Sequence, residues 1–358
     1  MSIFYFKTTK IIKNIHKIFY YIFLKYFQVT SKGDYKSFEY FGDDSFLKSL
    51  EEYLEIKASR ECKGFHFKCK HLIIVEDFTF NIFIKTIFCF KRLRIVDKHY
   101  FGLVGANTLF RLLYNDLTSK SEKEKIINES LSNFNDLSTL IKNQENIFVL
   151  GNNEDFSNII EKYKPQYLFT CNSSINNENI FNSELLVLSF SDPLFHFGIN
   201  EQALEYRNRL NTVLKDKENI YLVVPIEGIP LLKKIGLNKK LPIIGLDSTY
   251  LQFKVIKTRG KRLFTRNSHN VFTQYLLPIS SLCEKLKIIG AVTFSSKKAF
   301  EEKLWSHDEK IKETSNYNFA FDESFFGDRD FKKYYKFHDK QLNRLINKIK
   351  NKQIIKSL

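Results

Sequence analysis

The sequence lacks the motifs of several common nucleotide-handling and hydrolytic enzymes. It contains no glycine-rich Walker loop, no Gly-x-Gly-x-x-Gly fingerprint, no Gly-x-Ser-x-Gly elbow and no His-Glu-x-x-His pair. Each of these motifs supplies residues that its chemistry requires, such as a phosphate-binding loop, a serine nucleophile or zinc ligands. The sequence therefore argues against nucleotide hydrolases of the P-loop type, common dehydrogenases, serine hydrolases and zinc proteases.

Cysteine is also scarce, and its placement does not suggest a disulfide framework. The five cysteines are an odd number scattered along the chain, which favours reduced, buried thiols and a cytoplasmic location. One group is close enough in sequence to consider as a zinc site, namely Cys62, His66, Cys69 and His71. Its spacing matches no common zinc ligand pattern, so we expect no metal there.

Proline is absent from the first 164 residues, and all six prolines follow. A length of 358 residues suits two domains. A polar, helix-prone stretch from about residue 120 to 145 is typical of a helical connection between two domains. We therefore predict a basic segment over residues 1–30, a mixed α/β domain over 31–140 and a second domain over 146–358.

Acidic residues are missing before Asp34 and again between Lys340 and Leu358, while the whole chain has a net charge of +16. Two basic ends on a nearly balanced body favour an anionic membrane surface over a nucleic-acid partner. On a helix over Ile11–Phe27, Ile11, Ile15, Ile18 and Ile22 would share one face, with aromatic residues beside them. This helix would lie in the lipid interface or dock on the protein's own body. We expect a cytoplasmic protein, peripheral on the inner membrane face.

Alternating patterns divide the first domain into a helix and several strands. Phe46–Ile56 is an amphipathic helix, and His71–Val75, Phe78–Phe90 and Leu93–Val96 have the spacing of a small β-meander. We find no catalytic motif in this domain.

The second domain repeats short apolar runs followed by turns and helical stretches. Such runs predict strands that are buried on both faces, and alternation with helices predicts an α/β fold with a doubly wound, mostly parallel, Rossmann-like sheet. The expected strands are Ile147–Leu150, Tyr167–Cys171, Leu185–Phe190, Tyr221–Val224, Ile243–Leu246 and Lys287–Ile289. The expected helices are Asn200–Lys215, Gly228–Ile235 and Ser268–Lys285.

Polar residues follow the first three of these strands. Gly151 and Asn152 come after the first, Asn172 and Ser173 after the second, and Asp192 after the third. In doubly wound sheets ligands bind outside the carboxyl ends of the strands, so we expect these residues to rim one ligand site. A glycine admits close approach of a phosphate or ribose, and the amides and hydroxyl suit a ribose, a base edge or a sugar.

The order of these segments resembles that of bacterial lipooligosaccharide sialyltransferases, which use CMP-sialic acid. The resemblance rests on Gly151-Asn152, Cys171-Asn172, Asp192-Pro193-Leu194-Phe195 and a helix that opens at Ser268. It covers about residues 146–345. It implies a metal-independent, inverting glycosyltransferase with a CMP-sugar as donor, no resident cofactor, and a cell-surface glycolipid or polysaccharide as acceptor.

A late cluster supplies the expected catalytic residues. The resembling family uses a histidine just before a late helix, where this chain has His338, and a histidine suits a general base at neutral pH. Arg329 and Tyr335 would assist departure of the phosphate. His307 is the second candidate base. Asp328 and Asp330 formally match the Asp-x-Asp of metal-dependent transferases, but a CMP-sugar requires no metal.

The chain departs from the family at the first turn, where Asn153, Glu154 and Asp155 replace Gly-Pro-Ser. Two other functions therefore stay open. One is a pterin diphosphokinase-like enzyme that uses ATP with Mg²⁺. The other is a non-catalytic peripheral membrane protein with a degenerate nucleotide fold.

Overall fold

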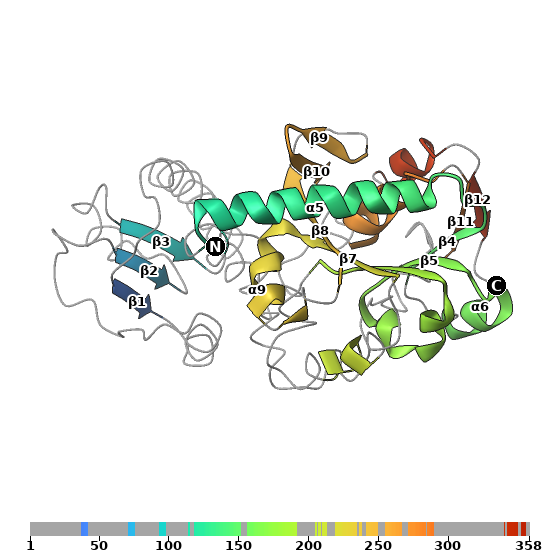
Figure 1. Cartoon of the computed structure of the whole chain (residues 1–358), viewed down its shortest axis with the longest axis horizontal. Coiled ribbons are helices and arrows are strands. Elements are labelled where there is room, and N and C mark those ends of the chain that lie inside the picture. The colour runs from blue at the N-terminus through green and yellow to red at the C-terminus, as the bar shows by residue number, and fades with distance from the viewer. Residues whose placement is uncertain are drawn as a thin grey trace, which may run out of the picture. The chain divides into compact units, whose positions relative to one another are not determined.

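A computed structural model describes two separate parts of the chain (Figure 1). The described residues are 37–41, 71–75, 93–97, 114, 118–151, 156–191, 205, 207–208, 210–212, 219–234, 236–237, 241–249, 255–266, 271–283, 285–289, 340, 342–349 and 352–355. Residues 1–117 form one compact unit and residues 118–358 form the other.

The first unit contains a parallel three-stranded sheet. Its strands β1 (Ser37–Phe41), β2 (His71–Val75) and β3 (Leu93–Asp97) lie in that order, and both neighbouring pairs are parallel. The predicted meander is therefore wrong, because a meander joins antiparallel neighbours. The long segments 42–70 and 76–92 give each connection the length that a parallel crossover needs. The expected elements Phe46–Ile56 and Phe78–Phe90, and the basic segment 1–30, lie outside the described residues.

The second unit is built on a nine-stranded sheet, and the predicted mostly parallel α/β architecture is confirmed. All six expected strands are present. Their bounds are β4 (Ile147–Leu150), β5 (Tyr167–Cys171), β6 (Leu185–Ser189), β7 (Ile220–Pro225), β8 (Ile243–Thr249) and β11 (Leu286–Ile289). They are buried along most of their length, as strands covered on both faces must be.

Three further strands were not predicted. They are β9 (Lys257–Arg259) and β10 (Arg262–Arg266), which form a hairpin, and β12 (Lys352–Ile355). The strand order is β12-β11-β4-β5-β6-β7-β8-β10-β9, and within the described residues only the β9–β10 pair is antiparallel. The chain moves from β4 towards β10 and then returns to place β11 on the other side of β4. A topological switch point therefore lies between β4 and β11.

Helices cover both faces of this sheet (Figure 1). The links between β4 and β8 include α6 (Phe156–Tyr163), the short turn η3 (Glu178–Asn182) and α9 (Ile229–Lys234). Because these strands follow one another in one direction, right-handed crossovers place their helices on a single face. The other face carries α5 (Lys120–Ile141), the π-helical turn η6 (Phe272–Leu276) and α10 (Leu277–Ser280).

The core on the α5 side shows the strand periodicity directly. Every second strand residue, such as Val149, Val187 and Val223, joins a buried cluster with residues of α5 and η6. The residues between them, such as Leu150 and Leu188, are equally buried but face the other layer. Apolar side chains on both faces explain why these runs show no alternation of polar and apolar residues.

Helix α5 belongs to the second unit and covers part of the sheet. Strand β10 pairs with β8 only from Asp247 onward, so the first half of β8 has an open edge. The side-chain amide of Asn133 donates to the carbonyl oxygen of Ile243 at 2.9 Å, and the Gly245 N–H donates to Ser130 Oγ at 3.1 Å. Two polar residues on the buried side of α5 thus satisfy the backbone groups of that edge.

The predicted helix Ser268–Lys285 is shorter and less regular than expected. Its described part begins at Val271, widens into the π-helical turn η6 and continues as α10, which contains Pro278. Proline has no N–H to donate, and its ring clashes with the carbonyl group four residues earlier, so the wider turn accommodates it. None of the helices that the structure describes has both the length and the apolar character to cross a lipid bilayer.

Candidate functional site

The carboxyl ends of β4, β5 and β6 meet at one edge of the second unit's sheet. These three strands are parallel neighbours, as the sequence predicted, and Cys171 at the end of β5 pairs with Ser189 at the end of β6. Gly151 directly follows β4, and Asn172 directly follows β5. The two predicted residues therefore lie at the same edge, with Gly151 beside the switch point between β4 and β11 and Asn172 one strand away. This is where open α/β sheets bind ligands.

Backbone and side-chain hydrogen bonds fix the ends of these strands. The Gly151 N–H donates to the carbonyl oxygen of Ile289 at 3.3 Å, which extends the ladder between β4 and β11. Thr170 Oγ1 donates to the carbonyl oxygen of Leu150 at 2.9 Å. The Gly151 N–H is thus engaged within the sheet, so any backbone N–H group of this turn that approaches a phosphate or ribose must come from another residue. Its structural contribution is to hold the β4–β11 junction together.

Asn172 stands out at this edge because its backbone and its side chain are both unusual. Its φ angle is +52°, in the left-handed region that only glycine and, less often, asparagine adopt easily. The residue is 2% exposed, and its side-chain oxygen Oδ1 is buried without a hydrogen-bond partner. Strained residues with unsatisfied groups persist where the surrounding structure holds them in place, and such residues concentrate at ligand sites.

Two serine hydroxyls near Asn172 have the same property. Ser174 lies in the short turn η2 (Asn172–Asn176), and Ser189 is the last residue of β6. Both residues are almost completely buried, at 1% and 0% exposure, and neither hydroxyl has a hydrogen-bond partner. Leaving such a group unsatisfied costs about 1–3 kcal/mol in a folded protein. Three unpaired polar atoms at the ends of two adjacent strands therefore indicate a position prepared for polar partners.

A charged group lies farther along the sheet, in β8. Asp247 is mostly buried, and its closest described counter-charge is Arg262 of β10, whose Nη1 lies 3.8 Å from Asp247 Oδ2. Burial and, to a lesser degree, the nearby Glu227 raise the pKa of Asp247 to about 6, while Arg262 acts in the opposite direction. The predicted site does not include this residue, although a carboxylate directly after the apolar run Ile243–Leu246 is a visible signal.

Most of the remaining predicted site residues lie outside the described residues. These are Asn152, Asp192 and Ser268 of the expected donor site, and Arg329, Tyr335 and His338 of the expected catalytic cluster. The backbone of Ser173 lies in η2, but its side chain is not described. Of the predicted residues, Gly151, Asn172 and the backbone of Ser173 are thus the ones that can be placed.

The described residues contain no group of three or more His, Cys, Asp or Glu side chains arranged to hold a metal ion. Asp328 and Asp330, which formally match the Asp-x-Asp metal motif, lie outside the described residues.

In comparisons with known proteins, no family model, no curated protein and no solved structure matches this chain.

Proposed function

We propose that the second unit binds a nucleotide-activated sugar at the carboxyl edge of β4–β6 and transfers the sugar to an acceptor. The observation that carries this proposal is the set of three buried, unpaired polar atoms: Asn172 Oδ1, Ser174 Oγ and Ser189 Oγ. An unligated site prepared for a polar molecule leaves such atoms without partners, and a bound ligand supplies them.

The chemistry of this set suits the neutral part of a nucleotide sugar. An amide oxygen accepts a hydrogen bond from a ribose hydroxyl or a base amino group, and a serine hydroxyl donates as well as accepts. None of the three groups is charged, so they match a ribose, a base edge or a sugar rather than a phosphate. The resemblance to sialyltransferases then assigns the anionic part of the donor to the later cluster, with Arg329 and Tyr335 near the phosphate and His338 as the base.

A CMP-activated acidic sugar is the donor that this resemblance favours, with no metal ion. The three strands that carry the resembling motifs are adjacent and parallel in the sheet, which supports the same arrangement. The acceptor would be a glycolipid or polysaccharide at the cell surface, and the basic ends of the chain would hold the enzyme at the inner membrane face.

Calorimetric titration with CMP and CMP-sialic acid tests the proposal on the full-length protein. We expect Asn172→Gly to weaken binding about tenfold, which corresponds to about 1.4 kcal/mol and to one lost hydrogen bond. Asn146→Gly is a matched control. Asn146 also has a positive φ angle, 64°, but it is exposed and directly precedes β4, at the opposite end of that strand. Glycine relaxes the backbone at both positions, so only the loss of the amide at Asn172 should affect the ligand.

Failure of CMP and CMP-sugars to bind would contradict the proposal. If binding is present, His338→Ala should abolish transfer while leaving donor affinity nearly unchanged. Turnover of ATP that requires Mg²⁺ and is lost in Asp328→Ala or Asp330→Ala would instead favour the diphosphokinase-like alternative. Binding to anionic vesicles without any binding of nucleotides would favour the second alternative, a non-catalytic peripheral membrane protein.

A further inference from the structure

The hairpin at the edge of the second unit concentrates positive charge. Residues 257–262, which comprise β9, the turn and the first residue of β10, are all exposed, and four of the six are lysine or arginine. Gly260 forms the turn with a φ angle of +60°, a conformation that suits glycine. The sequence has no acidic residue from Ser248 to Cys283. Of the four basic residues, Arg262 pairs with Asp247 of β8.

A second basic segment, residues 340–349, comes near the end of β10, where Arg344 acts on Arg266. In residues 340–349, Leu342, Ile346 and Ile349 are buried in the same core cluster as Leu263 of β10, while Lys340 and Arg344 are exposed. Burial and the nearby guanidinium of Arg344 both lower the pKa of Arg266, at the end of β10. Two segments that are far apart in the sequence therefore bring like charges together, which is unfavourable in the free protein.

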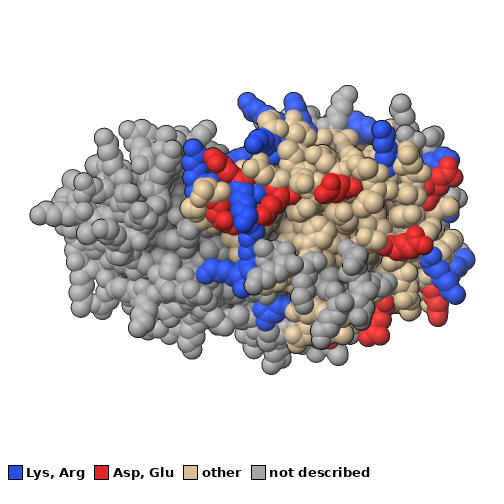
Figure 2. All heavy atoms as spheres, viewed as in Figure 1, with Lys and Arg blue, Asp and Glu red and all other residues tan. Residues whose placement is uncertain are grey.

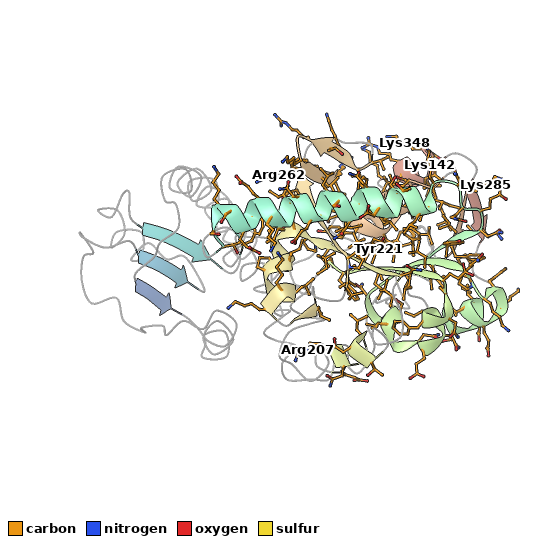
Figure 3. All side chains as sticks on the ribbon, viewed as in Figure 1. Lys142, Arg207, Tyr221, Arg262, Lys285 and Lys348 are labelled. Carbon is orange, nitrogen blue, oxygen red and sulfur yellow. The ribbon has the colours of Figure 1, made fainter. Side chains whose placement is uncertain are left out.

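We define this surface as the basic face, made of Lys257, Arg259, Lys261, Lys340 and Arg344. In Figure 2, lysine and arginine side chains gather along the upper margin of the second unit, where Figure 1 places the β9–β10 hairpin. In the view of Figure 3, Arg262 is labelled near the hairpin, and Lys142 and Lys348 are labelled near the C-terminal end of α5. The acidic residues Glu124 and Glu129 of α5 instead pair with lysines of α5 and, for Glu129, also with Lys233 of α9.

Protection of an edge strand accounts for part of this charge but not for all of it. Strand β9 is the last strand of the sheet, and charged side chains on an edge strand prevent pairing with other chains. One or two lysines on β9 would serve that purpose. The charge here continues through the turn to Lys261 and onto the separate segment 340–349, neither of which has a strand edge to protect.

We propose that the basic face is a docking surface for the anionic headgroups of a lipid bilayer. Long, exposed lysine and arginine side chains on several segments gain free energy near an anionic membrane without needing a shaped pocket. The sequence of Ile11–Phe27 adds apolar residues among lysines, which suits a lipid interface and has no counterpart on a nucleic acid. Single-stranded nucleic acids are bound by exposed aromatic residues, and the only exposed large hydrophobic residue in the described part is Leu140.

The test uses the full-length protein and three variants of equal chain length. The first replaces Lys257, Arg259 and Lys261 with glutamine. The control replaces Lys120, Lys125 and Lys162 with glutamine, because these exposed lysines of α5 and α6 change the net charge equally but lie outside the basic face. A third variant, Arg344→Gln, probes the second segment. Far-UV circular dichroism checks that all variants are folded.

Binding is measured by co-sedimentation with vesicles of phosphatidylcholine alone or mixed with phosphatidylglycerol in roughly equal amounts. Each charge near such a surface changes the partition coefficient about fivefold, so the hairpin variant should bind the anionic vesicles roughly 100-fold more weakly. Arg344→Gln should bind about fivefold more weakly, and the control should change much less than the hairpin variant. None of the proteins should gain affinity for phosphatidylcholine alone.

Equal losses in the hairpin variant and the control would overturn the proposal, because they would show an effect of net charge alone. Unchanged vesicle binding in the hairpin variant would also overturn it. Parallel titrations with a mixed-sequence DNA duplex and a single-stranded RNA provide the other comparison. A loss of nucleic-acid affinity without a loss of vesicle binding would assign the basic face to nucleic acid instead. Because no nucleotide sugar is present, these outcomes are independent of the proposed transferase activity.

Discussion

Replacing Asp247 with asparagine should stabilise the protein at neutral pH. The carboxyl group is mostly buried, with 16% of its side chain exposed, and its pKa in the folded state is about 6. An aspartate in an unfolded chain has a pKa of about 3.9. At neutral pH the folded protein must therefore hold a negative charge at a position that favours the neutral form.

The size of the effect follows from the linkage between protonation and folding. One pKa unit corresponds to about 1.4 kcal/mol, so the difference between about 6 and about 3.9 gives an upper limit of about 3 kcal/mol. Asparagine has nearly the same size and carries no charge, but it removes the ion pair with Arg262. That guanidinium is half exposed, so losing its partner costs little. We expect Asp247→Asn to raise the free energy of unfolding by about 1–3 kcal/mol at pH 7.

The sign of the pH dependence is the sharper test. Because the folded-state pKa of Asp247 is raised, the carboxyl group stabilises the fold fully below about pH 4, and this contribution is lost as the pH rises to about 6. The advantage of the variant over the wild type should therefore be small near pH 4 and should reach its full value above about pH 6. Hydrogen exchange of peptides that cover β7 and β8 measures the local difference, and urea denaturation followed by circular dichroism measures the global one.

Variants of two residues near Asp247 serve as controls, and they should change the free energy of unfolding in opposite directions. Glu227→Gln removes a like charge and should stabilise the protein at neutral pH, though by less than Asp247→Asn. Arg262→Gln removes the counter-charge and should destabilise it. The reasoning is refuted if Asp247→Asn is no more stable than the wild type at pH 7, or if its advantage is the same at about pH 4 as at about pH 7.

Other substitutions test the packing around β8 and the site. Gly245→Ala should lower the free energy of unfolding by about 1–3 kcal/mol, since its Cβ would lie 2.6 Å from Ile229 Cδ1; an unchanged urea midpoint would contradict this. Ser130→Ala should cost about 1–3 kcal/mol because the buried Gly245 N–H loses its acceptor, and hydrogen exchange at β8 should accelerate. Asn172→Gly should raise the melting temperature and weaken ligand binding, since it removes both the strained φ angle and the unpaired amide. A lower melting temperature would argue that the amide stabilises the free protein.

Strong local patterns made much of the second unit predictable. Strands such as β5 and β7 are short, mostly apolar runs bounded by turns, because a strand that is covered on both faces buries nearly every residue along its length. The hairpin strand β9 has no such signature, because all three of its residues are exposed and two are basic. It was missed because an edge strand is held by its backbone hydrogen bonds, which leave little trace in the sequence.

The direction of strand pairing was harder to predict. The runs that form β2 and β3 have the composition of strands, but composition does not distinguish parallel from antiparallel neighbours. The sequence of the first unit therefore suggested a meander where the structure has parallel pairs. In the second unit the intervening helical stretches supplied the missing information, because a helix between two strands implies a parallel crossover.

By itself, the sequence determined which segments of the second unit form its central strands, that helices separate them, and that Gly151 and Asn172 end neighbouring strands. These properties follow from burial patterns within a few consecutive residues. Only the tertiary structure decided that Asn172, Ser174 and Ser189 are buried without partners, that Gly151 is bonded to β11, and that Asp247 lies near Glu227 and Arg262. Each of these facts depends on which distant segments become neighbours, and burial and proximity acquire their energetic meaning only once the sheet has assembled.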